Sequence, residues 1–291
     1  MCRKRSIIIF VIFLLSSFCV RTFAQVTVMG DLLHQKETSI NSKYGGSMLI
    51  KNSSTTPKSV KVFQREYQNK CSGDLKLDLP DKSKNPRSNA AWISFSPQNL
   101  TVPPNGISRV NYTVDVPNDT LLKGSYFSAI IVEEIVSDRE TLVDEGAPTV
   151  TPKRVESKKT TVRTINKTNY VFLIVSDIEQ TGNFSAKISN PRLFKTKDNH
   201  RLLSFEMEND GEKVLKSIVW VELYNGSTGL KVRNGDNDKF MGGSGTLPPG
   251  SCTRKSIDLG IIPSGNYKAI IMVDAGGDNL WGSQYNFVFD K

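Results

Sequence analysis

The chain has 291 residues, a formal net charge of +9 and a hydrophobic fraction of 38%. This length has room for two domains of ordinary size, each with its own core. The basic excess is mild and no dense Lys/Arg face with interleaved aromatic residues occurs, so the composition does not indicate a nucleic-acid-binding protein.

Residues 1–24 have the pattern of a signal peptide. A basic start at residues 3–5 precedes a mostly apolar run, 6–20, that is too short to span a bilayer. The small residues that follow predict cleavage between Ala24 and Gln25. We therefore expect an exported protein, and an uncleaved anchor is the alternative.

Two cysteines, Cys71 and Cys252, follow the predicted leader. In an exported protein such a pair can form a disulfide, but the sequence does not show how far apart the two residues lie. Two cysteines are too few to frame a small disulfide-rich fold, so hydrophobic cores must stabilise the domains.

The chain after the leader is rich in short runs of β-branched and aromatic residues bounded by Gly, Pro, Asn and Asp. Such runs are typical of strands, and no long stretch has helical periodicity. In the first half the runs are 47–52, 59–67, 92–96, 107–116 and 125–136. Apolar residues occupy every second position from Val110 to Val116, which indicates a strand with one buried face.

A polar stretch, 137–161, predicts a long loop before the last strand of the first domain, 162–178. That strand contains six successive apolar residues: Tyr170, Val171, Phe172, Leu173, Ile174 and Val175. A strand with one solvated face should alternate, so this segment requires cover on both faces. Either the second domain or the long loop supplies the cover, or the edge or outer face receives a strand from a partner.

The second half repeats the scheme of the first, with runs at 201–209, 217–224, 252–259, 266–274 and 284–290. In both halves a Pro-Pro turn precedes a strand, a Gly-x-Tyr and then an apolar run containing Ala-Ile-Ile. The sequence therefore predicts an all-β fold of two immunoglobulin-like antiparallel β-sandwich domains in tandem, at 25–179 and 180–291.

Two tyrosines and two tryptophans are expected to have structural roles in these sandwiches. Tyr126 and Tyr267 follow the Gly-x, where a Greek-key sandwich often has a buried tyrosine whose hydroxyl bonds to the upstream backbone. Gly124 and Gly265 are expected to supply the permissive turn just before these tyrosines. Trp92 is expected to have a structural role, and Trp220 is expected to point into the second core.

No residue pattern singles out a reaction centre. The chain has two histidines and lacks HExxH, Cys-x-x-Cys, GxSxG and Walker motifs. Asn234, Asp236 and Asp238 are spaced two apart, as Ca²⁺ ligands can be, but the rest of an EF-hand is missing and a polar turn is preferred. We expect no catalytic residue, no metal and no cofactor.

The order of these segments resembles the PapD-like family, the two-domain immunoglobulin-like pilus-assembly chaperones of the bacterial periplasm. The resemblance covers about residues 26–178 and rests on "SMLIKN", "SVKVF", "WISFSPQNLTVPPNG" and the long hairpin before the second domain. "WISFSPQNLTVPPNG", "VPND" and "KGSYFSAIIV" also resemble the first domain of bacterial surface proteins that bind WxL-domain partners and peptidoglycan.

The chaperone resemblance implies that the last strand of the first domain lends alternate side chains to an incomplete pilin. The lending residues would be Val171, Leu173 and Val175, or Tyr170, Phe172 and Ile174. It also implies a basic residue on this strand, Arg163 or Lys167, that anchors a terminal carboxylate, although a solvated strand end explains each of them as well. The basic partner on the first strand is missing from "QVTVMGDLL", and "LLKGSY" replaces the usual acidic stretch.

These patterns lead to two hypotheses for a non-enzymatic protein that works by protein–protein contact. The first is a periplasmic chaperone-like protein that binds pilin-like or other surface subunits through its 162–178 strand. The second is a cell-surface adhesion module that binds a WxL-type protein, peptidoglycan or a glycan on exposed faces.

Overall fold

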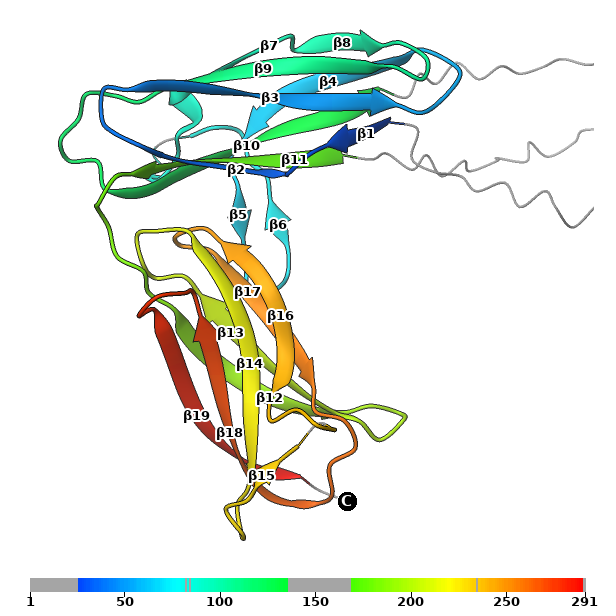
Figure 1. Cartoon of the computed structure of the whole chain (residues 1–291), viewed down its shortest axis with the longest axis vertical. Coiled ribbons are helices and arrows are strands. Elements are labelled where there is room, and N and C mark those ends of the chain that lie inside the picture. The colour runs from blue at the N-terminus through cyan, green and yellow to red at the C-terminus, as the bar shows by residue number, and fades with distance from the viewer. Residues whose placement is uncertain (1–25, 82, 84, 136–168, 234, 290–291) are drawn as a thin grey trace, which may run out of the picture.

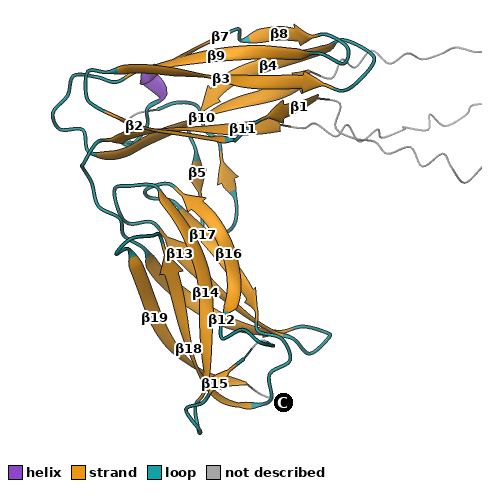
Figure 2. Ribbon diagram, viewed as in Figure 1, coloured by secondary structure: helices purple, strands orange, loops and turns teal. Residues whose placement is uncertain are grey.

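The computed structural model describes residues 26–81, 83, 85–135, 169–233 and 235–289. These residues form strands, connecting turns and one 3₁₀ turn, arranged as two β-sandwich domains of the immunoglobulin-like kind (Figures 1 and 2). The two domains lie as the arms of an L. In the described part of the chain, no helix is long and apolar enough to cross a membrane.

The first domain consists of two facing sheets. One has the strand order β1-β3-β9-β7, with β1 (Val26–Met29), β3 (Lys43–Asn52), β9 (Ile107–Asp115) and β7 (Ile93–Ser96). The other has the order β2-β11-β10-β4-β8, with β2 (Leu33–Thr38), β11 (Asn169–Ile178), β10 (Gly124–Ile135), β4 (Lys58–Arg65) and β8 (Asn99–Val102). The 3₁₀ turn η1 (Ala90–Trp92) leads into β7. All pairings are antiparallel except that of β2 with β11, which is parallel.

The core of the first domain lies between these two sheets. On β9, Val110, Tyr112 and Val114 are buried, which confirms the predicted alternation. They pack with buried residues of β11 such as Phe172 and Ile174 from the opposite sheet. Burying apolar surface in this way is the main favourable contribution to the stability of a sandwich.

The second domain is also a pair of sheets. One has the order β12-β13-β17, with β12 (Lys187–Lys195), β13 (Arg201–Glu208) and β17 (Cys252–Asp258). The other has the order β15-β14-β18-β19, with β15 (Lys231–Val232), β14 (Leu215–Asn225), β18 (Gly265–Asp274) and β19 (Leu280–Phe289), and β16 (Phe240–Leu247) also pairs with β14. The predicted domain division at 179/180 falls between β11 and β12.

The two Gly-x-Tyr tyrosines pack against the cores. The Tyr126 ring lies 4.8 Å from that of Trp92, and the Tyr267 ring stacks at 4.6 Å on that of Phe289. Gly124 has the φ of +70° that the expected turn requires, whereas Gly265, with a φ of +153°, is the nearly extended first residue of β18. However, neither tyrosine hydroxyl bonds to backbone within the described residues, so the predicted corner hydrogen bond is not found.

Trp92, in the 3₁₀ turn, and Trp220, on β14, differ in whether they face a core. Trp92 belongs to the first core. On β14, Val219 and Val221 point into the second core, so Trp220 between them lies on the outer face. There the Lys239 ammonium lies 4.1 Å from the ring centroid and covers it. The expectation that Trp220 points into the second core was therefore wrong.

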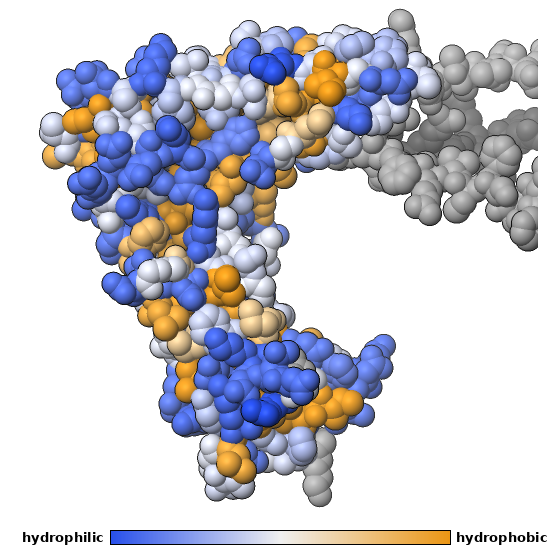
Figure 3. Space-filling model, in the orientation of Figure 1, coloured by the Kyte–Doolittle hydropathy of each residue, from blue (hydrophilic) through white to orange (hydrophobic). Residues whose placement is uncertain are grey.

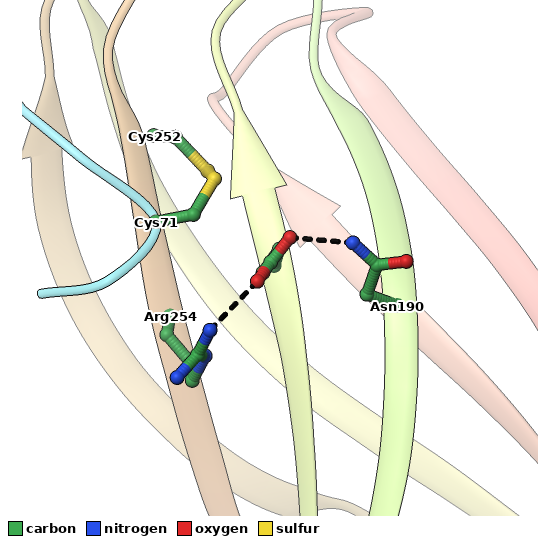
Figure 4. Close-up of a disulfide and its surroundings, with 5 residues drawn as sticks. Cys71, Asn190, Cys252 and Arg254 are labelled. Carbon is green, nitrogen blue, oxygen red and sulfur yellow. Dashed lines mark hydrogen bonds and ion pairs between the residues drawn. A yellow bond between two sulfur atoms is a disulfide. The ribbon is translucent and has the colours of Figure 1, made fainter.

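A small hairpin and a disulfide join the two domains. Strands β5 (Gln68–Asn69) and β6 (Leu75–Lys76) form a two-stranded ribbon that extends from the first domain toward the second (Figure 1). Cys71 lies in the turn between β5 and β6 and forms a disulfide bond with Cys252 at the start of β17 (Figure 4). The pairing that the sequence left open is thus present and crosses the domain boundary.

Direct hydrogen bonds and ion pairs also hold the domains together. The Ser125 N–H donates to the Glu212 carbonyl oxygen at 2.8 Å, and the Val214 N–H donates to the Ser125 hydroxyl at 2.8 Å. Lys123 and Arg87 lie 2.6 and 3.4 Å from the Glu212 carboxylate. The hydrogen bond from Lys123 lowers the pKa of Glu212.

Some expectations fall outside the described residues. These are the signal peptide at 1–24, the long loop at 137–161, Arg163, Lys167 and Asn234.

Candidate functional site

Strand β11 is buried on both faces through most of its length. Phe172 and Ile174 point into the core of the first domain. Leu173 and Val175 point the other way, into a cluster completed by Val214 of the second domain. The second domain therefore supplies the cover that the apolar run requires, as one of the alternatives proposed.

This burial changes which of the predicted binding residues are accessible. Leu173 and Val175 are packed beneath the second domain, and Phe172 and Ile174 are fully inside the first. Only Tyr170 and Val171 are partly exposed among the six. In this arrangement neither predicted set of three is free to be lent to a partner as a whole.

The backbone edge of β11 is open at its N-terminal end. Pairing with β2 begins at Leu173, whose N–H donates to the Leu32 carbonyl at 2.8 Å. Because backbone groups alternate sides along a strand, the N–H and C=O of Val171 and Asn169 point the same way. No strand in the described part of the chain pairs with them there. We call this stretch, Asn169–Phe172, the open edge.

Tyr170 fixes the side-chain orientation at the open edge. Its ring packs against the first core, and its hydroxyl donates to the Val26 carbonyl at 3.0 Å. Burial raises the pKa of Tyr170, so the phenol remains a donor at neutral pH. The bond ties β11 to β1 and leaves the neighbouring Val171 on the other face.

Apolar surface from both domains lies near the open edge. Met29, the last residue of β1, and Leu32, just before β2, are 42% and 44% exposed. A hollow of about 340 Å³ is lined by Leu33 on β2 and by β14 and β16 residues including Ile218, which is 48% exposed. Figure 3 shows apolar surface on both arms of the L. Leu33, which lines this hollow, pairs with Leu173, the residue that follows the open edge in β11.

His34 of β2 lies beside this edge, between the first core and solvent. Its ring is 5.5 Å from that of Phe172, Nδ1 is 2.9 Å from the Tyr112 hydroxyl, and Nε2 is 3.0 Å from the Asp31 carbonyl. A neutral ring with the proton on Nε2 satisfies both bonds, since the Tyr112 hydroxyl then donates to Nδ1. Burial lowers the pKa of His34 below its ordinary value of 6.5.

The lowered pKa of His34 predicts an acid-sensitive first domain. The unfolded chain takes up a proton below about pH 6.5 while the folded ring resists it, so stability is complete above that pH and is lost as the pH falls toward the folded-state pKa. The urea midpoint of unfolding, measured between pH 7.5 and 5, should decrease. His34→Gln should flatten this part of the profile, and an unchanged slope in the variant would contradict the assignment.

The described residues contain no group of three or more His, Cys, Asp and Glu side chains placed to hold a metal ion. Sequence reasoning missed the parallel β2–β11 pairing, which decides where the open edge ends. It also missed the hollow beside Ile218. Neither has a local sequence signal, because each depends on how distant segments meet.

Comparisons with known proteins give a resemblance in fold. No family model matches the chain, and no curated protein does. Solved structures of PapD-like fimbrial chaperones match it over most of its length. The chaperone–tip adhesin complex of CFA/I fimbriae matches at 12% identity over 90% of this chain and 98% of that chain, with a TM-score of 0.45. The class 5 fimbriae chaperone CfaA matches at 11% identity over 91% and 99%, with a TM-score of 0.41. The Pseudomonas aeruginosa CupB2 chaperone matches at 13% identity over 84% and 93%, with a TM-score of 0.36.

Proposed function

We propose that this chain is an exported, non-enzymatic chaperone-like protein of the periplasm that binds a surface subunit by strand addition at the open edge. The observation that carries the proposal is a strand whose backbone groups at one end have no partner strand within the described residues, and whose side chains are buried along the rest. The fold already holds such a strand in an extended conformation. A partner strand that pairs with it therefore does not have to order this segment first, which lowers the entropy cost of binding.

The proposed partner is an extended apolar segment of an incomplete β-sandwich subunit. Main-chain hydrogen bonds to Val171 and Asn169 would supply affinity. The partly exposed Val171 side chain and the hollow between Leu33 and Ile218 would supply selectivity for apolar residues. This assignment narrows the six-residue run suggested by the sequence to its first two residues, because Leu173 and Val175 pack under the second domain and the other two lie in the first core.

The experiment that tests the proposal removes one backbone N–H. Val171→Pro deletes the N–H that points to the open edge, and a proline is tolerated on an edge strand when that N–H has no partner within the fold. The ligand is a surface subunit that co-purifies with the unmodified protein. We expect this subunit to bind the Val171→Pro variant at least about tenfold more weakly, while the melting temperature of the variant changes little. Binding is measured by biolayer interferometry on the isolated complex components.

Val171→Ala is the matched control, because it shortens the side chain and keeps the N–H. It should bind far better than Val171→Pro. Equal binding by the proline variant and the unmodified protein would rule out strand addition at this position. If, in addition, the unmodified protein sedimented with purified peptidoglycan, the adhesion hypothesis would replace the chaperone hypothesis.

A further inference from the structure

Strand β19 forms one edge of the second domain (Figure 1). It has 10 residues and pairs with β18 along its whole length, and no strand of the described residues pairs with its other side. Strand β12 approaches from the facing sheet, where the Tyr285 hydroxyl donates to the Ile188 carbonyl at 3.0 Å, but β12 pairs with β13. The outer side of β19 therefore presents backbone groups without a partner strand in the described part of the chain.

The register of β19 shows which of its backbone groups face this outer side. The Ala275 N–H donates to the Asn279 carbonyl at 2.9 Å, and this pair continues the register of β18 with β19. Because hydrogen-bonded pairs recur at every second residue of an antiparallel ladder, the odd-numbered residues of β19 direct their backbone groups to β18. Gly282, Gln284 and Asn286 therefore direct their N–H and C=O groups to the outer side.

β19 lacks the features that usually keep an edge strand from pairing with another chain. Charged side chains, proline and β-bulges serve this purpose on natural sheet edges. β12, an edge of the facing sheet, has all three, with several basic residues, Pro191 and a register shift between Ser189 and Arg192. β19 has no charged residue and no proline, and its register with β18 is unbroken. Its outer side is therefore suited to pairing with a further strand.

The exposed apolar side chains of β19 are placed symmetrically along the strand. Leu280 is 51% exposed and Val288 is 66% exposed, and each lies four residues from Gln284. The three side chains point to the same face, opposite to Phe287, which packs against the core. An antiparallel pairing of two copies centred on Gln284 would place Leu280 of each copy opposite Val288 of the other. A two-fold interface requires this kind of self-complementarity, so the pattern favours a second copy as the partner.

We propose that β19 pairs antiparallel with β19 of a second copy of this chain, about a two-fold axis at Gln284. The two Gln284 side chains would meet at the axis, where an amide can both donate and accept a hydrogen bond. Asp278 precedes the strand and Asp290 follows it in the sequence, so no like charges lie opposite each other within the ladder. One strand from each copy gives a small interface, so the dimer is weak and depends on concentration. The surface belongs to the second domain and does not rest on the proposed function.

The test is sedimentation velocity of the purified, disulfide-bonded protein at concentrations from about 1 µM to about 1 mM. We expect a reversible monomer–dimer equilibrium with a Kd on the order of 100 µM or tighter. Gln284→Lys places two cations opposite each other at the axis and should weaken the dimer at least about tenfold. Its melting temperature should stay unchanged, because the Gln284 side chain is exposed. Ser227→Lys makes the same charge change at an exposed turn of the same domain and should dimerise like the unmodified protein.

A charge-swap experiment tests the position of the axis. Gln284→Lys and Gln284→Glu should each be monomeric alone, whereas an equal mixture should dimerise, because a lysine then meets a glutamate across the axis. The proposal would be overturned by an unmodified protein that stays monomeric, by undiminished dimerisation of Gln284→Lys, by the same loss in Ser227→Lys, or by a mixture that stays monomeric. A monomeric protein whose Gln284→Lys variant loses a different co-purifying protein would assign β19 to that protein and would also overturn it.

Discussion

Phe172→Ala is expected to lower the free energy of unfolding of the first domain by about 3–5 kcal/mol. Phe172 is fully buried in the first core, with the His34 ring packed edge-on at 5.5 Å. Truncation removes its apolar surface and leaves a cavity between two sheets that cannot close fully. Urea unfolding followed by tryptophan fluorescence and circular dichroism measures the change.

Val171→Ala is the matched control for this variant. Val171 is the neighbour on the opposite face and is partly exposed, so the same kind of truncation should cost less than about 1 kcal/mol. If Phe172→Ala were as mild as Val171→Ala, the placement of β11 would be wrong. The pair also separates stability from binding, because only Val171 belongs to the accessible part of the proposed site.

Loss of the interdomain disulfide is the second large effect that we expect. Cys71 and Cys252 are 181 residues apart in sequence, so the bond closes a long loop of the unfolded chain. Removing a crosslink of this kind typically costs about 2–5 kcal/mol. The Cys71→Ser/Cys252→Ser variant should therefore unfold at a lower urea concentration than the oxidised protein.

Two further measurements check the origin of that effect. Reduction and alkylation of the unmodified protein should reproduce the midpoint of the double variant. Small-angle scattering should show a broader range of interdomain arrangements without the bond, since the hairpin then loses its covalent attachment to β17. An identical midpoint for the oxidised protein and the double variant would contradict a stabilising role.

Much of the fold followed from short-range patterns. Alternation from Val110 to Val116 located a strand and its buried face, and the glycine of the first Gly-x-Tyr, Gly124, has the positive φ that a tight turn requires. These signals depend only on neighbouring residues, so a sequence can carry them.

Side-chain direction was less predictable where a strand is apolar on both faces. Ile218, Val219, Trp220 and Val221 form a continuous apolar run, and periodicity does not tell which side faces the core. The sheet places Val219 and Val221 inside, and Trp220 is buried on the outer face by Lys239. The contact is between residues of different strands, so the local pattern contained no sign of it.

The sequence predicted only part of the candidate site, because the rest depends on contacts between distant segments. The apolar run of 170–175 showed that both faces of β11 needed cover, but not what covers them. The answer depends on the Ser125–Glu212 and Ser125–Val214 hydrogen bonds that set the second domain against β11. Contacts between distant loops of this kind have no spacing in the sequence that would reveal them.

Amide hydrogen exchange at Val171 tests the account most directly. In the free protein this N–H points to the open edge and should exchange rapidly, whereas the N–H of Phe172 points to β10 and should exchange slowly. In the complex with its native subunit, Val171 should become strongly protected while Phe172 changes little. Exchange at Val171 that is as fast in the complex as in the free protein would contradict strand addition at the open edge.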